Sequence, residues 1–228
     1  MKDIKHIFFD LDHTLWDYDK SAGETLVEIY DLFQLRAQDV TTNEFVETFY
    51  TVNNQLWHRY NHGEVDRTYI KEHRFREIFT KLDVDLDFSL EASSYFLNHC
   101  STKPYLLPDS LTALNYLQDK YQLHIITNGF LDSQTNKLNH SGLMDFFDVI
   151  VTSECTGAKK PAESIFHYSL EKANAEISNS VMIGDNPRTD ISGAKKIGML
   201  TVLYDPSGRK RSLADFSIQS HLELIRLF

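Results

Sequence analysis

Cysteine is scarce in this sequence. Cys100 and Cys155 are the only two cysteines among 228 residues, and they lie far apart without the spacing of metal ligands. A thiolate metal site needs several clustered ligands, which two distant cysteines do not supply. We expect both thiols to be reduced and partly buried rather than joined in a disulfide.

Long hydrophobic runs are also missing. The N-terminal residues 1–5 lead into an apolar run of only about four residues, which is too short for a signal peptide or a transmembrane helix. We therefore expect a cytoplasmic protein without a membrane partner.

Basic residues are outnumbered. The sequence has 23 Lys and Arg against 33 Asp and Glu, a formal net charge of −10. A protein that binds a nucleic acid polymer needs a basic face for the phosphate backbone, so we expect no such partner. A small anionic substrate stays compatible with the acidic charge, because a local metal ion and a lysine can neutralise it.

The chain does contain short apolar runs that are typical of buried strands, separated by helical patterns. Continuous apolar runs suit strands that are covered on both faces. The predicted strands are 7–9, 123–126, 149–151, 181–183 and 201–203, and the predicted helices between them are 109–120, 133–140, 163–173 and 188–197. This alternation predicts an α/β fold with a doubly wound parallel sheet, a Rossmann-like core.

One long region interrupts the alternation. Between the first two strands the sequence shows only helical periodicity, with predicted helices at 25–35, 43–60, 67–82 and 90–100. We expect this region, 18–102, to form an inserted all-helical domain, and 1–17 with 103–228 to form the α/β core.

Polar side chains gather where the predicted strands end. In open parallel sheets, ligands bind outside the carboxyl ends of the strands. Those ends carry several carboxylates, a hydroxyl and an amide, and a lysine follows the third strand: Asp10, Asp12, Thr127, Asn128, Asp185, Asp190 and Lys160. Clustered carboxylates repel one another unless a cation holds them, and an all-oxygen ligand set favours Mg²⁺.

These residues form a pattern that resembles the haloacid dehalogenase-like hydrolase superfamily. All four motifs of that superfamily stand in the expected order, across nearly the whole chain: Asp10-Leu11-Asp12-His13-Thr14, Thr127-Asn128-Gly129, Lys160-Pro161 and Gly184-Asp185-Asn186-Pro187-Arg188-Thr189-Asp190. Two paired aspartates alone would be weak support, whereas the four motifs together are specific.

The resemblance implies a role for each matching residue. Asp10 matches the nucleophile that becomes an aspartyl-phosphate, and Asp12 matches the general acid and base. Thr127, with Asn128 and Gly129 beside it, matches the group that holds the phosphoryl substrate. Lys160 matches the lysine that offsets negative charge.

The resemblance also implies a metal site. Asp185 matches a direct Mg²⁺ ligand, together with Asp10 and the backbone carbonyl of Asp12, and Asp190 matches a residue of the second coordination shell. Lys159 competes with Lys160, but the family places its lysine directly before proline. One departure stands at His13, where family members commonly have glycine; a surface turn is the favoured interpretation, with contact to the substrate as the alternative.

The helical insertion resembles the cap of one subclass of this superfamily. Its polar and aromatic segment 53–63, together with Trp16 and the segment 126–130, is similar to the bacterial pyrimidine 5'-nucleotidases. That similarity implies a nucleoside monophosphate as substrate. Trp57 and Tyr60 are then candidates for stacking on the base, although aromatic residues on a helix face more often belong to the core.

Several alternatives stay open from the sequence. A phosphatase of sugar phosphates or other small metabolites would use the same core residues, and so would a phosphomutase. A phospho-accepting signalling module is a different class with a similar residue set, but such domains are shorter and have no helical cap. In every enzymatic case we expect a small phosphate ester as the partner and a monomer or homodimer.

Overall fold

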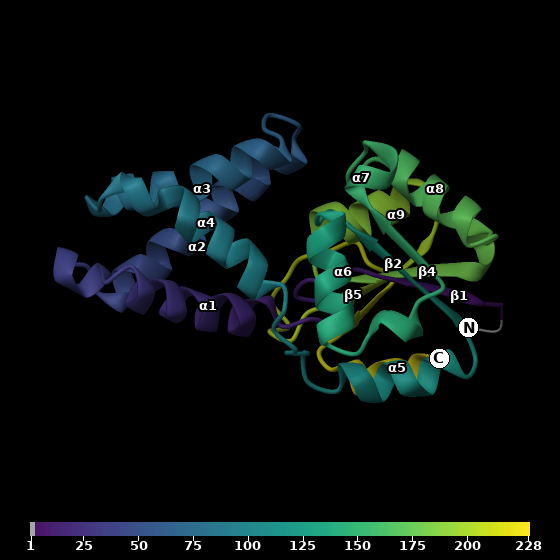
Figure 1. Cartoon of the computed structure of the whole chain (residues 1–228). Helices are drawn as coiled ribbons and strands as arrows, with labels where there is room; N and C mark the ends of the chain where they lie inside the picture. The colour runs from purple at the N-terminus through teal and green to yellow at the C-terminus, as the bar shows by residue number, and fades with distance from the viewer. Residues whose placement is uncertain (1–2) are drawn as a thin grey trace. The chain divides into compact units, whose positions relative to one another are not determined.

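The structure is a computed structural model that describes residues 3–228. The chain divides into two compact units (Figure 1). One comprises the residues up to Tyr18 together with Pro104–Phe228, and the other is the insertion Asp19–Lys103. The boundaries expected from sequence lie one residue away from these at each junction. Each unit is described by itself below.

The first unit is built on a six-stranded sheet in which every pair of neighbouring strands is parallel. The strand order is β3-β2-β1-β4-β5-β6. The strands are β1 (His6–Phe9), β2 (Gln122–Thr127), β3 (Val149–Thr152), β4 (Ser180–Gly184), β5 (Leu200–Tyr204) and β6 (Phe216–Ile218). The predicted doubly wound α/β core is confirmed, and the five predicted strands are all present.

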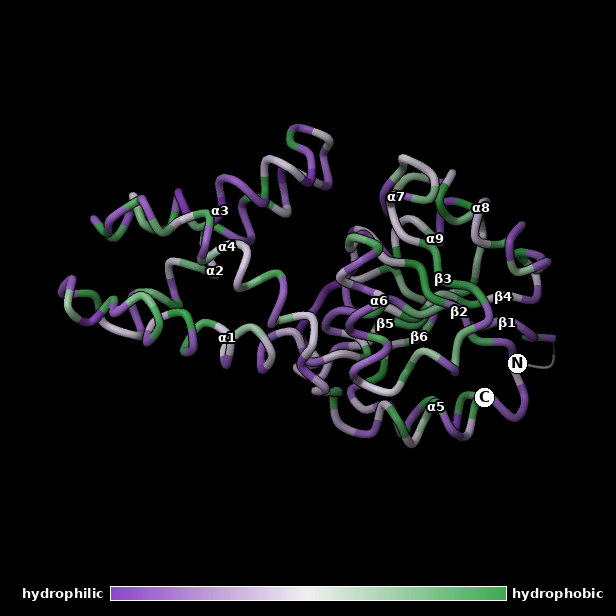
Figure 2. Tube along the Cα trace, in the orientation of Figure 1, coloured by the Kyte–Doolittle hydropathy of each residue, from purple (hydrophilic) through white to green (hydrophobic). Residues whose placement is uncertain are grey.

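Helices lie on both faces of this sheet (Figure 1). They are α5 (Ser110–Gln118), α6 (Leu131–His140), α7 (Ser153–Thr156), α8 (Glu163–Lys172), α9 (Ser192–Lys196) and α10 (Leu224–Leu227), with short 3₁₀ turns η3 (Met144–Phe146), η4 (Ile177–Asn179) and η6 (His221–Glu223). Hydrophobic residues gather along the strands (Figure 2), because each central strand is covered on both sides. On one face Phe8, Ile126 and Met182 pack with Phe166 of α8 and Ala194 of α9.

Two expectations for this unit need correction. Strand β6 was not predicted, because it has only three residues, one of them buried, and contains no continuous apolar run. The predicted continuous helix 188–197 is wrong: a π-helical turn, η5 (Pro187–Ile191), precedes the short α9. Asn186 causes the wide turn, since its carbonyl oxygen accepts the N–H groups of both Asp190 and Ile191.

The insertion is all-helical, with α1 (Tyr18–Leu32), η1 (Leu35–Gln38), α2 (Thr42–Asn61), α3 (Arg67–Leu82), η2 (Leu86–Phe88) and α4 (Ser89–Cys100). The first helix begins seven residues before its predicted start and ends earlier, because Gln34 adopts a left-handed conformation with φ of 51°. Helix α2 starts with a capping box between Thr41 and Glu44. No helix among residues 3–228 is both long and apolar enough to cross a membrane.

The core of the insertion is aromatic. Phe49, Phe75 and Phe96 pack against one another and surround the guanidinium of Arg74, which lies 4.5 Å from the Phe96 ring centroid. Cation–π contacts stabilise a buried guanidinium where water is excluded. Asn53 accepts a hydrogen bond from the same group at 3.3 Å.

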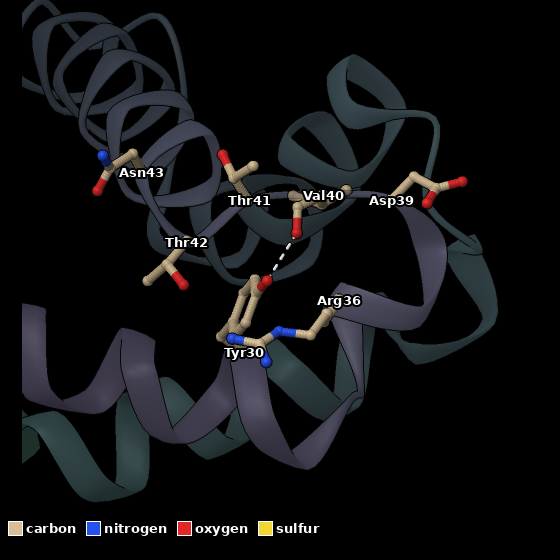
Figure 3. A pocket seen from close by; sticks show the side chains of 7 residues that line it. All are labelled: Tyr30, Arg36, Asp39, Val40, Thr41, Thr42 and Asn43. Atoms are coloured by element: carbon tan, nitrogen blue, oxygen red, sulfur yellow. Dashed lines mark hydrogen bonds between the residues drawn. The ribbon is translucent and has the colours of Figure 1, made fainter.

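A shallow hollow of about 470 Å³ lies where η1 meets the start of α2 (Figure 3). The Tyr30 hydroxyl crosses it and donates to the Val40 carbonyl oxygen at 2.7 Å. That bond fixes the connection between α1 and α2, and the residues that line the hollow belong to this connection and the helix ends beside it.

The two cysteines are free. Cys100 is buried, whereas Cys155 is exposed, so partial burial is a wrong expectation for the second thiol.

Two buried histidines meet near the start of the sheet. The ring nitrogens of His6 on β1 and His124 on β2 lie 3.1 Å apart. Burial, followed by the neighbouring His6, lowers the pKa of His124 to about 4. Burial, followed by Lys5, also lowers the pKa of His6. Both imidazoles are therefore neutral in the folded protein at pH 7.

This pair predicts acid sensitivity. The unfolded chain takes up a proton at each histidine near pH 6.5, while folded His124 resists protonation until about pH 4, so stability is lost as the pH falls through this window. The melting temperature of the His124→Leu variant should fall less between pH 7 and pH 5 than that of the wild type, by on the order of 5 °C. The exposed His167→Leu variant on α8 is the control; identical pH profiles for His124→Leu and the wild type would contradict the assignment.

Candidate active site

The site lies at the carboxyl ends of the three central strands. Asp10 directly follows β1, Thr127 ends β2, and Asp185 follows β4. The Asp10 N–H donates to the Ile183 carbonyl oxygen at 2.9 Å, which continues the sheet pairing up to the carboxylate. From β1 the chain adds β2 and β3 on one side of the sheet, and then β4, β5 and β6 on the other. Doubly wound folds bind their ligands at this point, where the strand order reverses.

A tight turn after Asp10 is held from three directions. The Leu11 carbonyl oxygen accepts the N–H groups of Thr14, Leu15 and Trp16. The Thr14 hydroxyl accepts the Asp185 N–H at 3.0 Å, which joins the turn to the end of β4. The buried His221 ring lies 2.6 Å from the Thr14 carbonyl oxygen and so ties the turn to the C-terminal segment.

His13 occupies the sharpest point of this turn. Its φ is 60°, in the left-handed region, and its side chain is exposed. Glycine adopts that conformation without strain, which explains why glycine is common here in the family that the motifs resemble. Histidine is one of the few other residues enriched in this region, so the turn survives the substitution.

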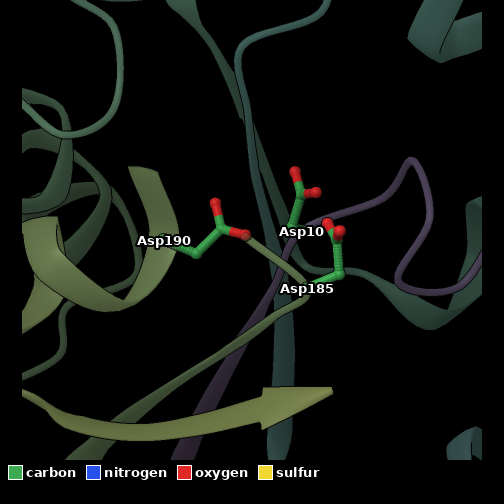
Figure 4. A group of neighbouring side chains, drawn as sticks. All are labelled: Asp10, Asp185 and Asp190. Atoms are coloured by element: carbon green, nitrogen blue, oxygen red, sulfur yellow. The ribbon is translucent and has the colours of Figure 1, made fainter. Parts of the chain in front are cut away.

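Three carboxylates meet behind the turn (Figure 4). One oxygen from each of Asp10, Asp185 and Asp190 lies within 4.8 Å of the others. Hard oxygen donors at such distances fit a divalent cation such as Mg²⁺. Burial raises the pKa of Asp185, and the charge of Asp190 raises it further. A positive charge beside the cluster would therefore stabilise the ionised carboxylates.

Lys160 supplies part of that charge. Its ammonium lies 2.7 Å from oxygens of Asp10, Asp190 and the Ile126 carbonyl, and its side chain is only 2 % exposed. These three acceptors use all three donors of the ammonium. Burial opposes the charge on Lys160, yet the two carboxylates raise its pKa above the ordinary value.

The pKa of Asp10 reflects the same cluster. Burial raises this pKa well above its ordinary value and the attraction of Lys160 opposes the shift, while Asp190 and Asp185 add to it. A further cation beside the three carboxylates would favour ionised Asp10.

Asn128 fixes the loop that carries Lys160. Its side-chain amide donates to the Lys160 carbonyl oxygen at 2.9 Å and its side-chain oxygen accepts the Lys160 N–H at 2.8 Å. The pair of bonds places the lysine backbone beside β2. The lysine that bonds Asp10 and Asp190 is Lys160, the one directly before Pro161.

The carboxylate of Asp12 is not in the cluster of three. It accepts hydrogen bonds from Gln134 at 2.9 Å and from Lys137 at 2.6 Å. Burial alone would raise the pKa of Asp12, but Lys137 and then the Gln134 hydrogen bond hold it below its ordinary value. The backbone carbonyl of Asp12, the atom that the motif assigns to the metal, accepts no hydrogen bond from residues 3–228.

Thr127 is linked to Asp12 through Gln134. Its hydroxyl oxygen lies 3.0 Å from the Gly129 N–H and 2.6 Å from the Gln134 side-chain amide. A Cβ atom at Gly129 would stand 2.2 Å from that amide nitrogen, so a larger residue there would displace the Gln134 side chain. Gln134 therefore connects Thr127 to Asp12.

Three further residues lie at the site and were not predicted from the sequence: Gln134, Lys137 and Lys210. The first two share one face of α6, and their three-residue spacing in a predicted helix that follows a site-bearing strand was the available signal. Lys210 comes from the loop after β5 and lies 2.9 Å from an Asp185 carboxylate oxygen. Nothing in its local pattern indicates that contact.

Residues 4–198 match the family model described as haloacid dehalogenase-like hydrolase. The chain belongs to this family. The resemblance that the four motifs indicated, to the haloacid dehalogenase-like (HAD-like) hydrolases, is thus confirmed.

The HAD-like chain has close relatives with named activities. It is 33 % identical over 206 residues to the pyrimidine 5'-nucleotidase YjjG of Escherichia coli (strain K12), covering 90 % of this chain and 88 % of the relative. It is 31 % identical over 204 residues to the ribulose-1,5-bisphosphate 5-phosphatase of Halopiger xanaduensis, covering 88 % and 84 %. The first relative is named as a nucleotidase and the second as a phosphatase.

A solved structure supports the fold. The HAD-hydrolase YfnB of Bacillus subtilis, bound to magnesium, superposes with a TM-score of 0.89 at 24 % identity, covering 99 % of each chain. At this identity the match shows the HAD-like fold, and the metal belongs to that protein.

The cap candidate Trp57 belongs to the other unit of this HAD-like chain. It lies on α2, half-buried, with its ring edge-on to Tyr60 at a centroid distance of 5.3 Å. Tyr60 itself is buried, which favours a core role for that residue.

Close packing at Gly184 generates a stability prediction. A Cβ atom there would lie 2.3 Å from the Asp190 carboxylate, which Lys160 holds in place, so the Gly184→Ala variant should lose about 1–3 kcal/mol of unfolding free energy. Gly23 in helix α1 has no atom within 4 Å of such a Cβ, so Gly23→Ala should be neutral or stabilising by about 0.5–1 kcal/mol. Urea denaturation measures both, and equal behaviour of the two variants would refute the packing argument.

Proposed function

We propose that this HAD-like hydrolase is a magnesium-dependent phosphomonoesterase that works through an aspartyl-phosphate on Asp10, with pyrimidine nucleoside monophosphates as substrates. One observation carries the proposal: Asp10 is fixed between Lys160 and two further carboxylates, while the carboxylate of Asp12 is held apart from them. This separation suits two aspartates with different tasks.

The first chemical step uses both aspartates. A carboxylate oxygen of Asp10 attacks phosphorus, and the bond from phosphorus to the ester oxygen breaks. The negative charge of the bound phosphate ester favours the protonated form of Asp12 against the pull of Lys137, and Asp12 gives that proton to the leaving oxygen, so the alcohol departs neutral. Thr127 holds the transferring group, and the positive charge of Lys160, fixed beside Asp10, offsets part of its negative charge.

The second step restores the enzyme. Asp12, now a carboxylate, takes a proton from water while the water oxygen attacks phosphorus and the bond to Asp10 breaks. Phosphate leaves and Asp10 is a carboxylate again. The ion pair with Lys137 favours the ionised form of Asp12 that this step requires.

The residues that would hold Mg²⁺ are Asp10, Asp185 and the backbone carbonyl of Asp12. When bound, the cation would share the phosphoryl oxygens and neutralise charge that develops on them. We assign Asp190 an indirect role, because one of its oxygens bonds Lys160 and the other accepts the Asn186 N–H at 3.0 Å.

We further propose that the helical unit acts as the cap that selects the leaving group. It is inserted directly after the turn that carries Asp10 and Asp12, and caps of this kind exclude water and discriminate among substrates. The nucleotide preference draws its support from the relative YjjG, and sugar phosphates are the second candidate because of the relative that is a ribulose-1,5-bisphosphate 5-phosphatase. Location in the cytoplasm and a monomer or homodimer stay predictions.

Phosphate release from a panel of nucleoside monophosphates and sugar phosphates, with Mg²⁺ and with chelator, tests the function. We expect chelator-sensitive release, highest for pyrimidine nucleotides, and a loss of roughly 10³-fold or more in Asp10→Asn because the nucleophile is removed. An unchanged melting temperature of Asp10→Asn serves as the folding control.

Other outcomes are equally informative. Chelator-sensitive release from sugar phosphates alone would keep the mechanism and replace the substrate. Near-normal turnover by Asp10→Asn would overturn the covalent mechanism. No release from any ester would favour phosphotransfer or signalling.

Trp57 offers a test of base recognition. Stacking of an aromatic ring on a base contributes about 1–3 kcal/mol, so Trp57→Ala should raise KM for nucleoside monophosphates roughly 5- to 150-fold while KM for p-nitrophenyl phosphate changes little. Phe88→Ala, which truncates an exposed aromatic ring of the same unit, is the matched control. Equal effects on both substrates would return Trp57 to a structural role.

A further inference from the structure

A buried lysine lies outside the four motifs. Lys137 of α6 is 7 % exposed, and its ammonium bonds the Asp12 carboxylate at 2.6 Å. The same ammonium lies 4.6 Å from the Trp16 ring centroid and 6.0 Å from that of Tyr18. Burying a charge is costly unless it is paired, so this lysine is kept in place by Asp12 and the aromatic faces together.

Gln134 reaches Asp12 from the preceding turn of the same helix. Its amide nitrogen is the donor to Asp12 at 2.9 Å and lies 2.6 Å from the Thr127 hydroxyl oxygen. The orientation of the amide follows from chemistry, because an ionised carboxylate only accepts hydrogen bonds. The side-chain oxygen of Gln134 is buried and has no hydrogen-bond partner within residues 3–228, a cost that the two contacts of the nitrogen must offset.

Both carboxylate oxygens of Asp12 are therefore engaged by one helix. Lys137 bonds one oxygen and Gln134 the other, which leaves the carboxyl plane a single orientation. Gln134 also ties that orientation to Thr127 at the end of β2. The absence of a side chain at Gly129 makes room for this link.

We propose that Lys137 and Gln134 are positioning residues that hold the Asp12 carboxyl group in the orientation needed for proton transfer to the leaving oxygen. This inference rests on the proposed function, in which Asp12 is the general acid. Misplacement of a reacting group by about 1 Å can reduce a rate by about 10²-fold, so loosening Asp12 should have a large effect.

The leaving group provides the readout. A nucleoside leaves as a basic alkoxide and needs the proton, whereas p-nitrophenol leaves as a stable anion and does not. If Lys137 and Gln134 position Asp12, their removal should slow hydrolysis of the nucleotide more than that of p-nitrophenyl phosphate. A defect in folding or in phosphoryl binding should slow both reactions alike.

The experiment measures kcat and KM for uridine 5'-monophosphate and for p-nitrophenyl phosphate in the nearly isosteric variants Lys137→Met and Gln134→Met. We expect kcat for the nucleotide to fall about 10- to 100-fold more than kcat for p-nitrophenyl phosphate, with KM little changed. Lys172→Met on α8 also removes a lysine that lies over an aromatic ring, remote from any site residue in sequence, and should match the wild type on both substrates.

Asp12→Asn separates the two hypotheses. If Asp12→Asn shows the selective loss and Lys137→Met does not, the positioning role is overturned while the general acid stands. If Asp12→Asn itself shows no selectivity, the general-acid assignment fails. The double variant Asp12→Asn/Lys137→Met should be no more selective than Asp12→Asn alone, because the two act on one proton transfer.

Lys137→Arg guards against a folding defect. Arginine keeps the ion pair with Asp12 and should recover at least part of the selective loss, whereas a melting temperature near that of the wild type confirms folding. Equal rates for Lys137→Arg and Lys137→Met, with both proteins folded, would contradict a role through the Asp12 contact.

Discussion

The ammonium of Lys160 organises the centre of this protein. It is almost fully buried and joins Asp10 after β1, Asp190 in η5 and the carbonyl of Ile126 in β2. Three elements that are distant in sequence thus meet at one cation, and each carboxylate would be costly to bury without it. Asn128 then sets the position of the lysine backbone, so the geometry of the cluster depends on a pair of hydrogen bonds one strand away.

Much of this arrangement was predictable from the sequence. Apolar strands that end in Asp10, Thr127 and Asp185 must present these residues at the same edge once the strands are parallel. Gln134, Lys137 and Lys210 were not predictable in the same way, because their partners are carboxylates distant in sequence. Local patterns report burial and helical phase, not the identity of a polar partner across the fold.

The departures in backbone structure have a similar origin. Residues 188–197 were predicted to form one helix, yet the N–H groups of Asp190 and Ile191 both bond Asn186 and widen the first turn. That turn places Asp190 against Lys160. Short β6 is mostly exposed and carries no apolar run, so its pairing with β5 follows from the sheet and not from its own sequence.

The two chain segments that flank the helical insertion are paired with each other. The Asp17 N–H donates to the Tyr105 carbonyl oxygen and the Leu107 N–H donates to that of Leu15, around a bridge between Trp16 and Leu106. The insertion therefore leaves and re-enters the α/β unit at two adjacent points, as a hairpin loop does, whatever its length. The entropy of closing a loop grows only slowly with its length, so an insertion of another size at this point would leave the strands that carry Asp10, Thr127 and Asp185 in place. Under the proposed function, substrate range would diversify in one module while the phosphoryl chemistry stays constant in the other.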